Sequence, residues 1–444
     1  MKSLSGKTAP NTGAGSSLGS EISLLLVSEG ASIGGCDLRL ATAEKVVREI
    51  QLAGGEAMVV GMDVSDDRAV NYGQPRRGDA LMRKSLRRGL LSVLVLVIFC
   101  SKSVAWADSA RVSHDTLGTM EKRYVQMWQS ENGPLTATPP APLARLLTSQ
   151  PKNSDTPAYD TLSSRDGLAA LTQKYVTDKQ PVARIINVDV AVPGRKIPVR
   201  IYNPHPDRAT GVIFFIHGGG HLSGSVDVYD PISRHLAAAT GNTVVAVDYR
   251  RAPESPYPEG LNDARDVLMQ VYAILDQNRV AWKPQLTLAG DSGGGAFSAT
   301  LAGDLQVKHP GFISRLVLIY PSLDYTLSWP SADENGQGKL LDKSKVAWYF
   351  SQYFQHNEDR KALSPLYRPV TRAFPPTLIF SGGLDPLRDE DFAFVARLKA
   401  AGVPVKQVHF PGMVHAFLML ENLVPQQTDR VYRETADFIT APVR

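Results

Sequence analysis

Residues 286–295 read LTLAGDSGGG, a short apolar run followed by a turn that holds a serine among glycines. The apolar run predicts a buried strand, and the residues after the glycines predict a helix. A serine on such a turn, with glycine two positions before and two after it, is typical of a nucleophile. Gly290 and Gly294 leave room for the neighbouring strand and helix, and the helix N-terminus favours developing negative charge. The stretch therefore makes Ser292 the candidate nucleophile.

Two other interpretations fit the same letters. An ordinary strand-to-helix turn can also be rich in glycine, and GDSGG at 290–294 matches the serine motif of chymotrypsin-like proteases. That protease fold is all-β and requires a histidine before an aspartate before the serine. Helical stretches surround Ser292, and no Ala-Ala-His-Cys stretch precedes it. These features exclude the protease fold and favour a sheet flanked by helices.

A second glycine-rich turn, HGGG at 217–220, follows an apolar run upstream of the serine. Consecutive glycines let backbone N–H groups turn toward a substrate oxygen without Cβ collisions. In folds with such a serine turn, this loop and the residue after the nucleophile supply the oxyanion hole. The expected donors are the amides of Gly219, Gly220 and Gly293. We expect His217 to hold the loop by hydrogen bonds rather than to act as a base; a purely structural turn is the alternative.

An acid and a base come later in the chain. Asp385 and His415 each follow an apolar, strand-like run. Parallel strands place the loops at their carboxyl ends on one rim of a sheet, where ligand sites form. The order Ser292, Asp385, His415 predicts that His415 takes the serine proton while Asp385 orients the imidazole. The nearest alternatives are Asp389, which suits a helix N-terminus, and His409, which lies inside an expected strand.

Short apolar runs alternate with amphipathic stretches over residues 185–444. Apolar runs without polar alternation suit parallel strands that are buried on both faces. The expected strands are 185–192, 197–202, 212–216, 243–247, 286–289, 316–319, 377–380 and 405–410. The expected helices are near 229–239, 261–275, 296–307, 389–401 and 428–439. This pattern predicts an α/β catalytic domain with a mostly parallel sheet of about eight strands flanked by helices.

From about Asn187 to Val443 the chain resembles the hormone-sensitive lipase family of bacterial esterases, which has the α/β-hydrolase fold. The matching motifs are HGGG at 217–220, DYRRAPE at 248–254, YP at 257–258, GDSGG at 290–294, DPLRDE at 385–390 and HAF at 415–417. The resemblance implies hydrolysis of short- to medium-chain acyl esters without a cofactor or metal. It also implies a helical cap, from part of 108–177 and from 325 to about 366. His221 replaces a common aromatic residue, which bears on the substrate pocket, and Gly293 replaces a common alanine.

Two other functions are alternatives to ester hydrolysis. An amidase or peptidase on the same fold would use the same residues, and a non-catalytic ligand-binding relative would not need all three of them. The expected partner is a small-molecule ester. Nucleic acid is not expected, because much of the net charge of +4 comes from arginines and lysines clustered at 76–88. The two cysteines, Cys36 and Cys100, precede the expected catalytic domain, so that domain has no disulfide or thiolate metal site.

Residues 4–70 resemble the first half of a short-chain dehydrogenase/reductase. The likeness rests on TGAGSSLG at 12–19, on Asp37 and on the pair Asp63-Val64. In that family the glycines let the backbone approach a dinucleotide pyrophosphate, and an acidic residue after the second strand holds the ribose.

This segment departs from the family in ways that affect binding. Ser17 replaces the middle glycine, Pro10 falls where the first strand should end, and no Tyr-x-x-x-Lys pair follows. Two β-α units also supply too little sheet to bury a core. We therefore expect residues 1–81, a truncated Rossmann-like fragment plus spacer, to lack a nucleotide site and oxidoreductase activity.

Residues 82–107 have the layout of a secretory signal peptide. A basic head precedes the apolar run 89–100, and small residues at Ala105 and Ala107 suit cleavage. The run is short for a membrane span, so none is expected after cleavage; an uncleaved anchor is the alternative. A signal of this kind predicts that translation starts at Met82 and that the enzyme is secreted or periplasmic. An extension that is retained and masks the signal would leave the enzyme cytoplasmic. A cap or linker region is expected over 108–184.

Overall fold

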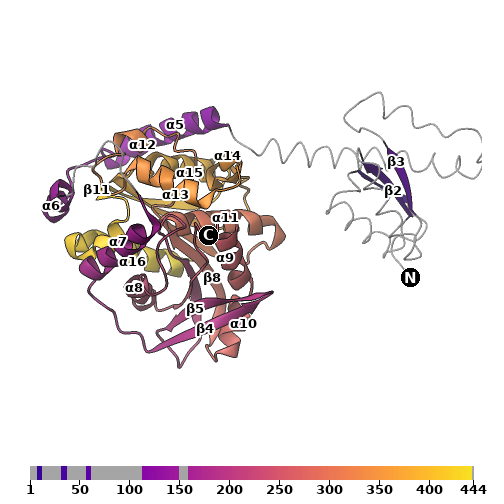
Figure 1. The fold of residues 1–444 in the computed structure, drawn as a ribbon, viewed down its shortest axis with the longest axis horizontal. Helices are drawn as coiled ribbons and strands as arrows, with labels where there is room; N and C mark the ends of the chain where they lie inside the picture. The colour runs from indigo at the N-terminus through magenta and orange to yellow at the C-terminus, as the bar shows by residue number, and fades with distance from the viewer. Residues whose placement is uncertain (1–7, 13–31, 38–56, 62–112, 150–158, 443–444) are drawn as a thin grey trace, which may run out of the picture. The chain divides into compact units, whose positions relative to one another are not determined.

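The computed structural model describes residues 8–12, 32–37, 57–61, 113–149 and 159–442. The chain divides into two compact units, Met1–Asp108 and Ser109–Arg444 (Figure 1). The expected signal segment and the glycine-rich turn after Thr12 lie outside the described residues. Within the ranges given above, no helix has the length and apolar character needed to cross a membrane.

The described part of the first unit is a small parallel sheet. Its strands, in spatial order, are β1 (Thr8–Thr12), β2 (Ser32–Asp37) and β3 (Ala57–Gly61). Pro10 lies inside β1, opposite Gly34, so the prediction that the strand ends there is wrong by two residues. β1 is at the edge of this sheet, which is where a strand tolerates a residue without an N–H.

The second unit is built on an eight-stranded sheet, as predicted. Its spatial order is β11-β10-β9-β8-β6-β7-β5-β4, and only the pairs β4–β5 and β5–β7 are antiparallel. The strands are β4 (Arg184–Val192), β5 (Arg195–Asn203), β6 (Thr210–Ile216), β7 (Thr243–Val247), β8 (Trp282–Asp291), β9 (Arg315–Ile319), β10 (Thr377–Leu384) and β11 (Val405–Val414).

Each central strand is buried on both faces. In β6, Val212, Phe214 and Ile216 enter one apolar core, while Ile213 and Phe215 enter the other. The first core is completed by α9 (Glu259–Met269), α11 (Ser292–Lys308) and α15 (Arg388–Ala400). The second is completed by α8 (Asp230–Thr240) and α16 (Pro425–Thr440) (Figure 1). The continuous apolar runs in the sequence follow from this double burial.

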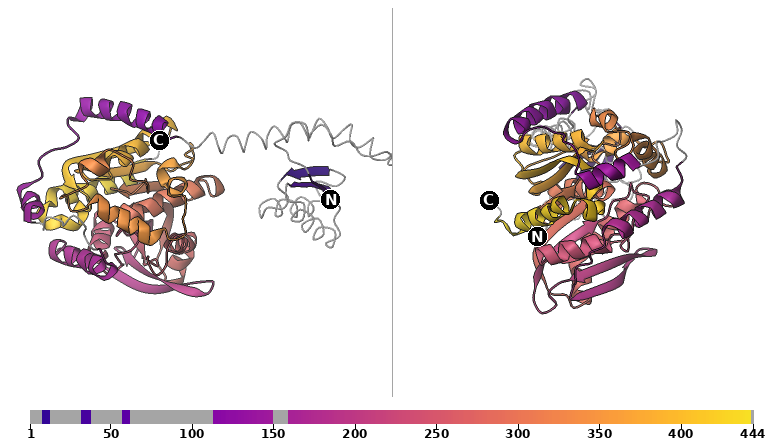
Figure 2. Two further views of the ribbon diagram at one scale, coloured as in Figure 1. Left: turned by 45° about the horizontal axis from the view of Figure 1, so that its top comes forward. Right: turned by 90° about the vertical axis from the view of Figure 1, so that its left-hand side faces the viewer.

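The remaining helices come from two separate stretches of chain. Before the sheet lie α5 (His114–Asn132), α6 (Ala141–Ser149) and α7 (Thr161–Tyr175). Between β9 and β10 lie α12 (Ser331–Glu334), α13 (Lys343–Tyr353), α14 (Arg360–Leu363) and the 3₁₀ helix η1 (Pro365–Tyr367). α5 packs on α15 (Figure 2). The Trp128 ring makes an edge-to-face contact with that of Phe392 at 5.7 Å.

Several boundaries differ from the sequence-based expectation. The stretch expected as one helix over 261–275 is two helices, α9 and α10 (Val271–Gln277), which break at Gln270. β11 continues past Pro411 to Val414, and β10 continues to Leu384. Because the strands are longer than expected, Asp385 and His415 directly follow their carboxyl ends.

Candidate active site

The turn between β8 and α11 holds Ser292 in a constrained conformation. β8 ends at Asp291 and α11 begins at Ser292, whose φ of 49° lies in the left-handed region. A Cβ on Gly290 would lie 2.4 Å from the carbonyl oxygen of Gly294, and one on Gly294 would lie 2.0 Å from that of Ile216. No side chain fits at either position. The predicted need for glycine on both sides of Ser292 is therefore met in the structure.

Three side chains from three separate loops form one hydrogen-bonded chain. Nε2 of His415 lies 2.8 Å from Oγ of Ser292, and Nδ1 of His415 lies 2.8 Å from Oδ2 of Asp385. An ionised carboxylate can only accept, so Nδ1 donates to Asp385 and the neutral imidazole accepts from the serine at Nε2. The structure thus brings together the three residues that the sequence analysis selected.

Asp385 is held firmly behind the imidazole. Its side chain is fully buried, and its second carboxylate oxygen accepts a hydrogen bond from the Leu387 amide at 2.8 Å. The Asn335 side chain donates to the Asp385 carbonyl at 3.0 Å, which fixes the loop itself. Because both oxygens are occupied, the carboxylate has one orientation from which to bind His415.

The rejected alternatives are engaged elsewhere. The buried His409 ring donates from Nε2 to the Leu135 carbonyl at 2.7 Å and accepts from Ser381 at Nδ1. Burial lowers the pKa of His409 to about 4, so its imidazole is neutral at neutral pH. Asp389 lies in the first turn of α15 and accepts from the Ser331 amide at 2.8 Å. Both residues play the packing and helix-end roles that the sequence predicts.

The loop after β6 approaches the serine from the neighbouring strand. Gly219 and Gly220 have φ values of 109° and 63°, which few other residues adopt. The Gly219 carbonyl accepts from the amide of Ser223 at 2.8 Å, and this bond closes the turn. His217 donates from Nδ1 to the Gly218 carbonyl at 2.8 Å and stacks on Tyr249 at 4.4 Å. As expected, His217 stabilises the loop.

Asp291 is a site residue for which the sequence analysis assigned no role. Its side chain accepts from the Gly218 amide at 2.7 Å and from the Tyr229 hydroxyl at 2.9 Å. It therefore joins the serine turn to the loop at 217–220. Burial raises the pKa of Asp291 to about 6, and the two hydrogen bonds oppose that rise. Its position between Gly290 and the candidate nucleophile Ser292 was the available signal.

A cavity of about 310 Å³ opens above Ser292. The backbone side of its lining includes Gly219, Gly220 and Gly293, together with Ser292 and His415. Opposite them, α7 and α13 contribute mostly apolar side chains: Leu168, Leu171, Val346, Tyr349 and Phe350. These two helices form the cap, and they come from the two stretches in which a cap was expected.

His221 lines this cavity in an unusual state for a histidine. Its ring stacks between Phe297 at 4.6 Å and Tyr353 at 4.2 Å. In the part of the chain that the structure describes, neither ring nitrogen has a hydrogen-bond partner. Burial lowers the pKa of His221 to about 3, so the ring is neutral. The residue that departs from the family pattern is thus a cavity-lining member of an aromatic stack.

Arg165 fastens the cap helix α7 to the floor of the site. Its guanidinium donates to the carbonyls of Leu222 at 3.0 Å and Ala252 at 2.9 Å, and it pairs with Glu254 at 2.6 Å. Leu222 directly follows His221. No sequence signal marked this residue, because its partners, two backbone carbonyls and the Glu254 carboxylate, are far away along the chain.

Comparisons with known proteins show the family of this fold. A family profile for the α/β-hydrolase fold matches residues 213–419, and one for short-chain dehydrogenases matches residues 7–73. The ethyl acetate hydrolase of Pseudomonas putida is 33% identical over 244 residues, which are 52% of this chain and 75% of that protein. The carboxylesterase NlhH of Mycobacterium tuberculosis is 35% identical over 295 residues, which are 62% of this chain and 90% of that protein.

A solved structure of a hyperthermophilic esterase from the archaeon Pyrobaculum calidifontis is 28% identical. Its TM-score is 0.62, and the match covers 68% of this chain and 98% of that one. The fold, the ordered motifs and these relatives all lead to one assignment. The chain belongs to the hormone-sensitive-lipase-like esterases of the α/β-hydrolase fold and is a serine hydrolase of the carboxylesterase class.

Proposed function

We propose that Ser292, His415 and Asp385 form the catalytic triad. The observation that carries the proposal is the unbroken chain of two 2.8 Å contacts from Ser292 through His415 to Asp385. His415 removes the serine proton as Oγ attacks the ester carbonyl, and Asp385 stabilises the imidazolium that results. His415 then gives that proton to the departing alcohol, which leaves an acyl-enzyme on Ser292.

The second half of the reaction uses the same groups. His415 removes a proton from a water molecule, whose oxygen attacks the acyl carbon. The bond from the acyl carbon to Oγ of Ser292 then breaks, His415 returns the proton to Oγ, and the acid leaves. We propose that the amides of Gly219, Gly220 and Gly293 hold the oxyanion in both halves. This proposal is supported by the position of the three glycines, which all line the cavity next to Ser292. Loss of one such donor typically costs about 10² to 10³ in rate.

We propose that the substrates are esters with short- to medium-chain acyl groups. The cavity volume of about 310 Å³ supports this, because ligand pockets range from about 300 to 1,000 Å³ and this one is near the lower limit. Its cap side is lined by leucine, valine and phenylalanine side chains, which suit an apolar acyl chain.

The test is a Ser292→Ala variant assayed with p-nitrophenyl esters of increasing acyl length and with matched amides. We expect kcat to fall by about 10⁶, as it does when a triad serine is removed. The Ser322→Ala variant is the control, because it removes another hydroxyl from the same cavity and should retain most of the activity. Equal turnover by Ser292→Ala and the wild type would refute the triad. Faster cleavage of amides than of esters would favour the amidase alternative.

A further inference from the structure

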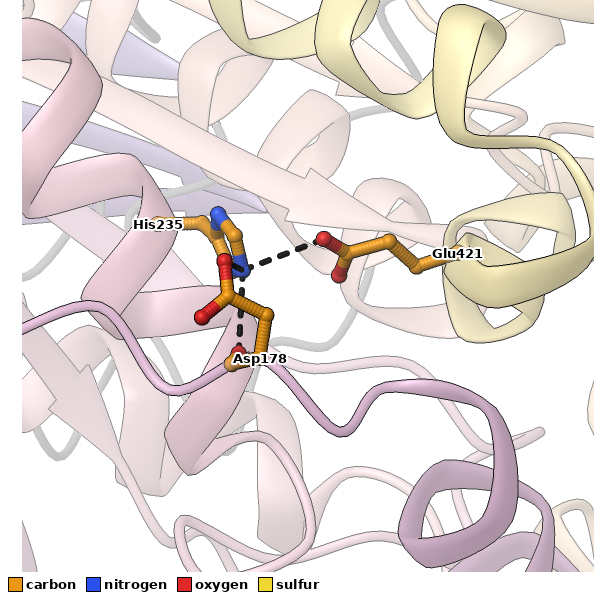
Figure 3. A group of neighbouring side chains, drawn as sticks. All are labelled: Asp178, His235 and Glu421. Atoms are coloured by element: carbon orange, nitrogen blue, oxygen red, sulfur yellow. Dashed lines mark hydrogen bonds and ion pairs between the residues drawn. The ribbon is translucent and has the colours of Figure 1, made fainter.

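Three potential metal ligands meet on the side of the molecule that carries α8. Asp178 comes from the connection between α7 and β4, and His235 from α8. Glu421 comes from the 3₁₀ helix η2 (Phe417–Leu423). Figure 3 shows the carboxylates of Asp178 and Glu421 on either side of the His235 imidazole. None of the three lines the substrate cavity.

The donor atoms are close to the spacing that a metal ion requires. Nε2 of His235 lies 3.3 Å from Oε1 of Glu421 and 3.9 Å from Oδ2 of Asp178 (Figure 3). One donor atom from each residue lies within 4.8 Å of the other two. Ligands in a tetrahedral zinc site with bonds of about 2.0 to 2.2 Å are roughly 3.3 to 3.6 Å apart. A small movement of Asp178 therefore completes the geometry.

An unpartnered buried oxygen supplies an independent indication. Glu421 is only 7% exposed, and its Oε2 has no hydrogen-bond partner among the described residues. A buried carboxylate oxygen without a donor is costly, and such atoms are usually satisfied by a protein group, water or an ion. The carboxylate end of Glu421 faces His235 (Figure 3), so the unsatisfied oxygen lies at the same cluster.

We propose that Asp178, His235 and Glu421 bind one first-row divalent transition cation, for which Zn²⁺ is the closest match. One imidazole nitrogen with two carboxylates is a donor set that zinc accepts, whereas magnesium and calcium prefer oxygen alone. Binding would replace the hydrogen bond that His235 Nε2 donates to the Asp178 carbonyl at 3.1 Å, and the Nε2 proton would be released. A water molecule completes the four-coordinate shell.

The proposed cation site is accessible, and the Gln180 side chain competes with the cation for one ligand oxygen. The Asp178 side chain is 60% exposed, so an ion can enter past it. Gln180 donates to Oδ2 of Asp178 at 2.6 Å, and this is the same oxygen that lies 3.9 Å from Nε2 of His235, so a cation bound through Oδ2 would replace this hydrogen bond. The His235 ring is held in place, because the Tyr432 ring stacks on it at a centroid distance of 4.9 Å and an interplanar angle of 10°.

The position in the fold indicates a structural rather than a catalytic role. η2 begins at Phe417, two residues after His415, so the cation would attach the segment that follows the catalytic base to α8. It would also attach the connection that follows cap helix α7. Zinc would stabilise the folded state without taking part in ester hydrolysis.

The experiment uses the full-length chain without an affinity tag, after treatment with a chelator. Zinc chloride is titrated by calorimetry, and Tm is measured with and without the metal. We expect the wild type to bind one zinc equivalent more than Glu421→Gln, and its Tm to rise by at least about 3 °C at saturating zinc. Asp178→Asn, a change at an exposed position that should not affect folding, should weaken zinc binding at least about tenfold.

Asp429→Asn is the matched control. Asp429 is an exposed neighbour whose charge acts on Glu421, but it is outside the proposed ligand set. This variant should keep both the extra zinc equivalent and the Tm shift. The proposal is overturned if Glu421→Gln and Asp178→Asn bind zinc as the wild type does, or if magnesium chloride produces the same Tm shift as zinc. Loss of binding in the control would also overturn it, because general charge attraction would then explain the affinity.

Discussion

At the scale of single residues, the Asp385–His415 hydrogen bond determines which ring nitrogen carries the proton. The Asp385→Asn variant presents an amide that can donate toward Nδ1, and this favours the tautomer that cannot accept the serine proton. We expect kcat on a short-chain ester to fall by about 10⁴, with little change in folding. Steady-state kinetics measure the fall, and circular dichroism checks the fold. A loss of less than about tenfold would mean that Asp385 does not orient the base.

Both buried ring nitrogens of His221 have no partner among the residues that the structure describes, and this has an energetic cost. In His221→Phe the ring can keep its stacking on Phe297 and Tyr353 while the polar atoms are removed. We expect the free energy of unfolding to rise by about 1 kcal/mol, since an unsatisfied buried polar group costs about 1 to 3 kcal/mol. Urea denaturation measures the change. Destabilisation would show that the nitrogens are satisfied in the native protein.

The sequence predicts the reactive side chains of the site better than the residues that hold the surrounding loops in place. Ser292, Asp385 and His415 could be selected because each is a reactive type directly after an expected strand, in a known order. Asp291 and Arg165 could not be assigned roles. Their partners include backbone groups on other loops, and such pairings depend on loop geometry that no local pattern encodes.

At the scale of elements, the connection between cap helix α7 and the loops below it depends on Arg165. Arg165→Ala removes two hydrogen bonds to the carbonyls of Leu222 and Ala252 along with the pair to Glu254. We expect KM for a short-chain ester to rise about three- to tenfold, with a smaller change in kcat, because the cap would be positioned less firmly. Initial-rate kinetics over a range of ester concentrations measure both constants.

Glu254→Gln is the matched control for this change. It weakens only the exposed ion pair, which is worth at most about 1 kcal/mol, and it leaves the two backbone hydrogen bonds of Arg165 in place. Its KM should remain within about twofold of the wild type. If both variants raise KM equally, the charge pair and not the backbone contacts positions the helix.

Elements of the sheet were predictable because their burial leaves a clear apolar pattern. All eight strands lie where the sequence places them, since both faces of most are covered by helices. The cap was predictable only as a region. α7 has a weak apolar face, and Leu168 and Leu171 contact the cavity rather than a continuous core. The break at Gln270 also leaves no glycine or proline signal.

At the scale of the whole molecule, burial of acids makes stability depend on pH. The pKa of Asp291 is raised from 3.8 to about 6 by burial. The folded state therefore holds this proton more tightly than the unfolded chain. The resulting stabilisation is complete below about pH 4 and is lost as the pH rises through 6.

We expect Asp291→Asn, which has no proton to lose, to remove this dependence. The free energy of unfolding of the wild type, relative to the variant, should decrease by up to about 3 kcal/mol between pH 4 and pH 7. Urea denaturation of both proteins at four pH values measures the difference. A difference that is constant with pH would show that the Asp291 carboxyl titrates at the same pH in the folded and unfolded states.

The strand order determines which part of the sheet opens first when the protein is heated. β11 is the last strand of the eight, and His415 directly follows it. Among the described strands it pairs only with β10, and Leu135 and Ala137 add two further hydrogen bonds to it. Border strands open more readily than central ones, because fewer neighbours hold them. We therefore expect mild heating to displace the His415 imidazole and to stop ester hydrolysis while most of the sheet is still intact. Residual turnover is thus a more sensitive gauge of damage during purification or storage than a spectrum of secondary structure.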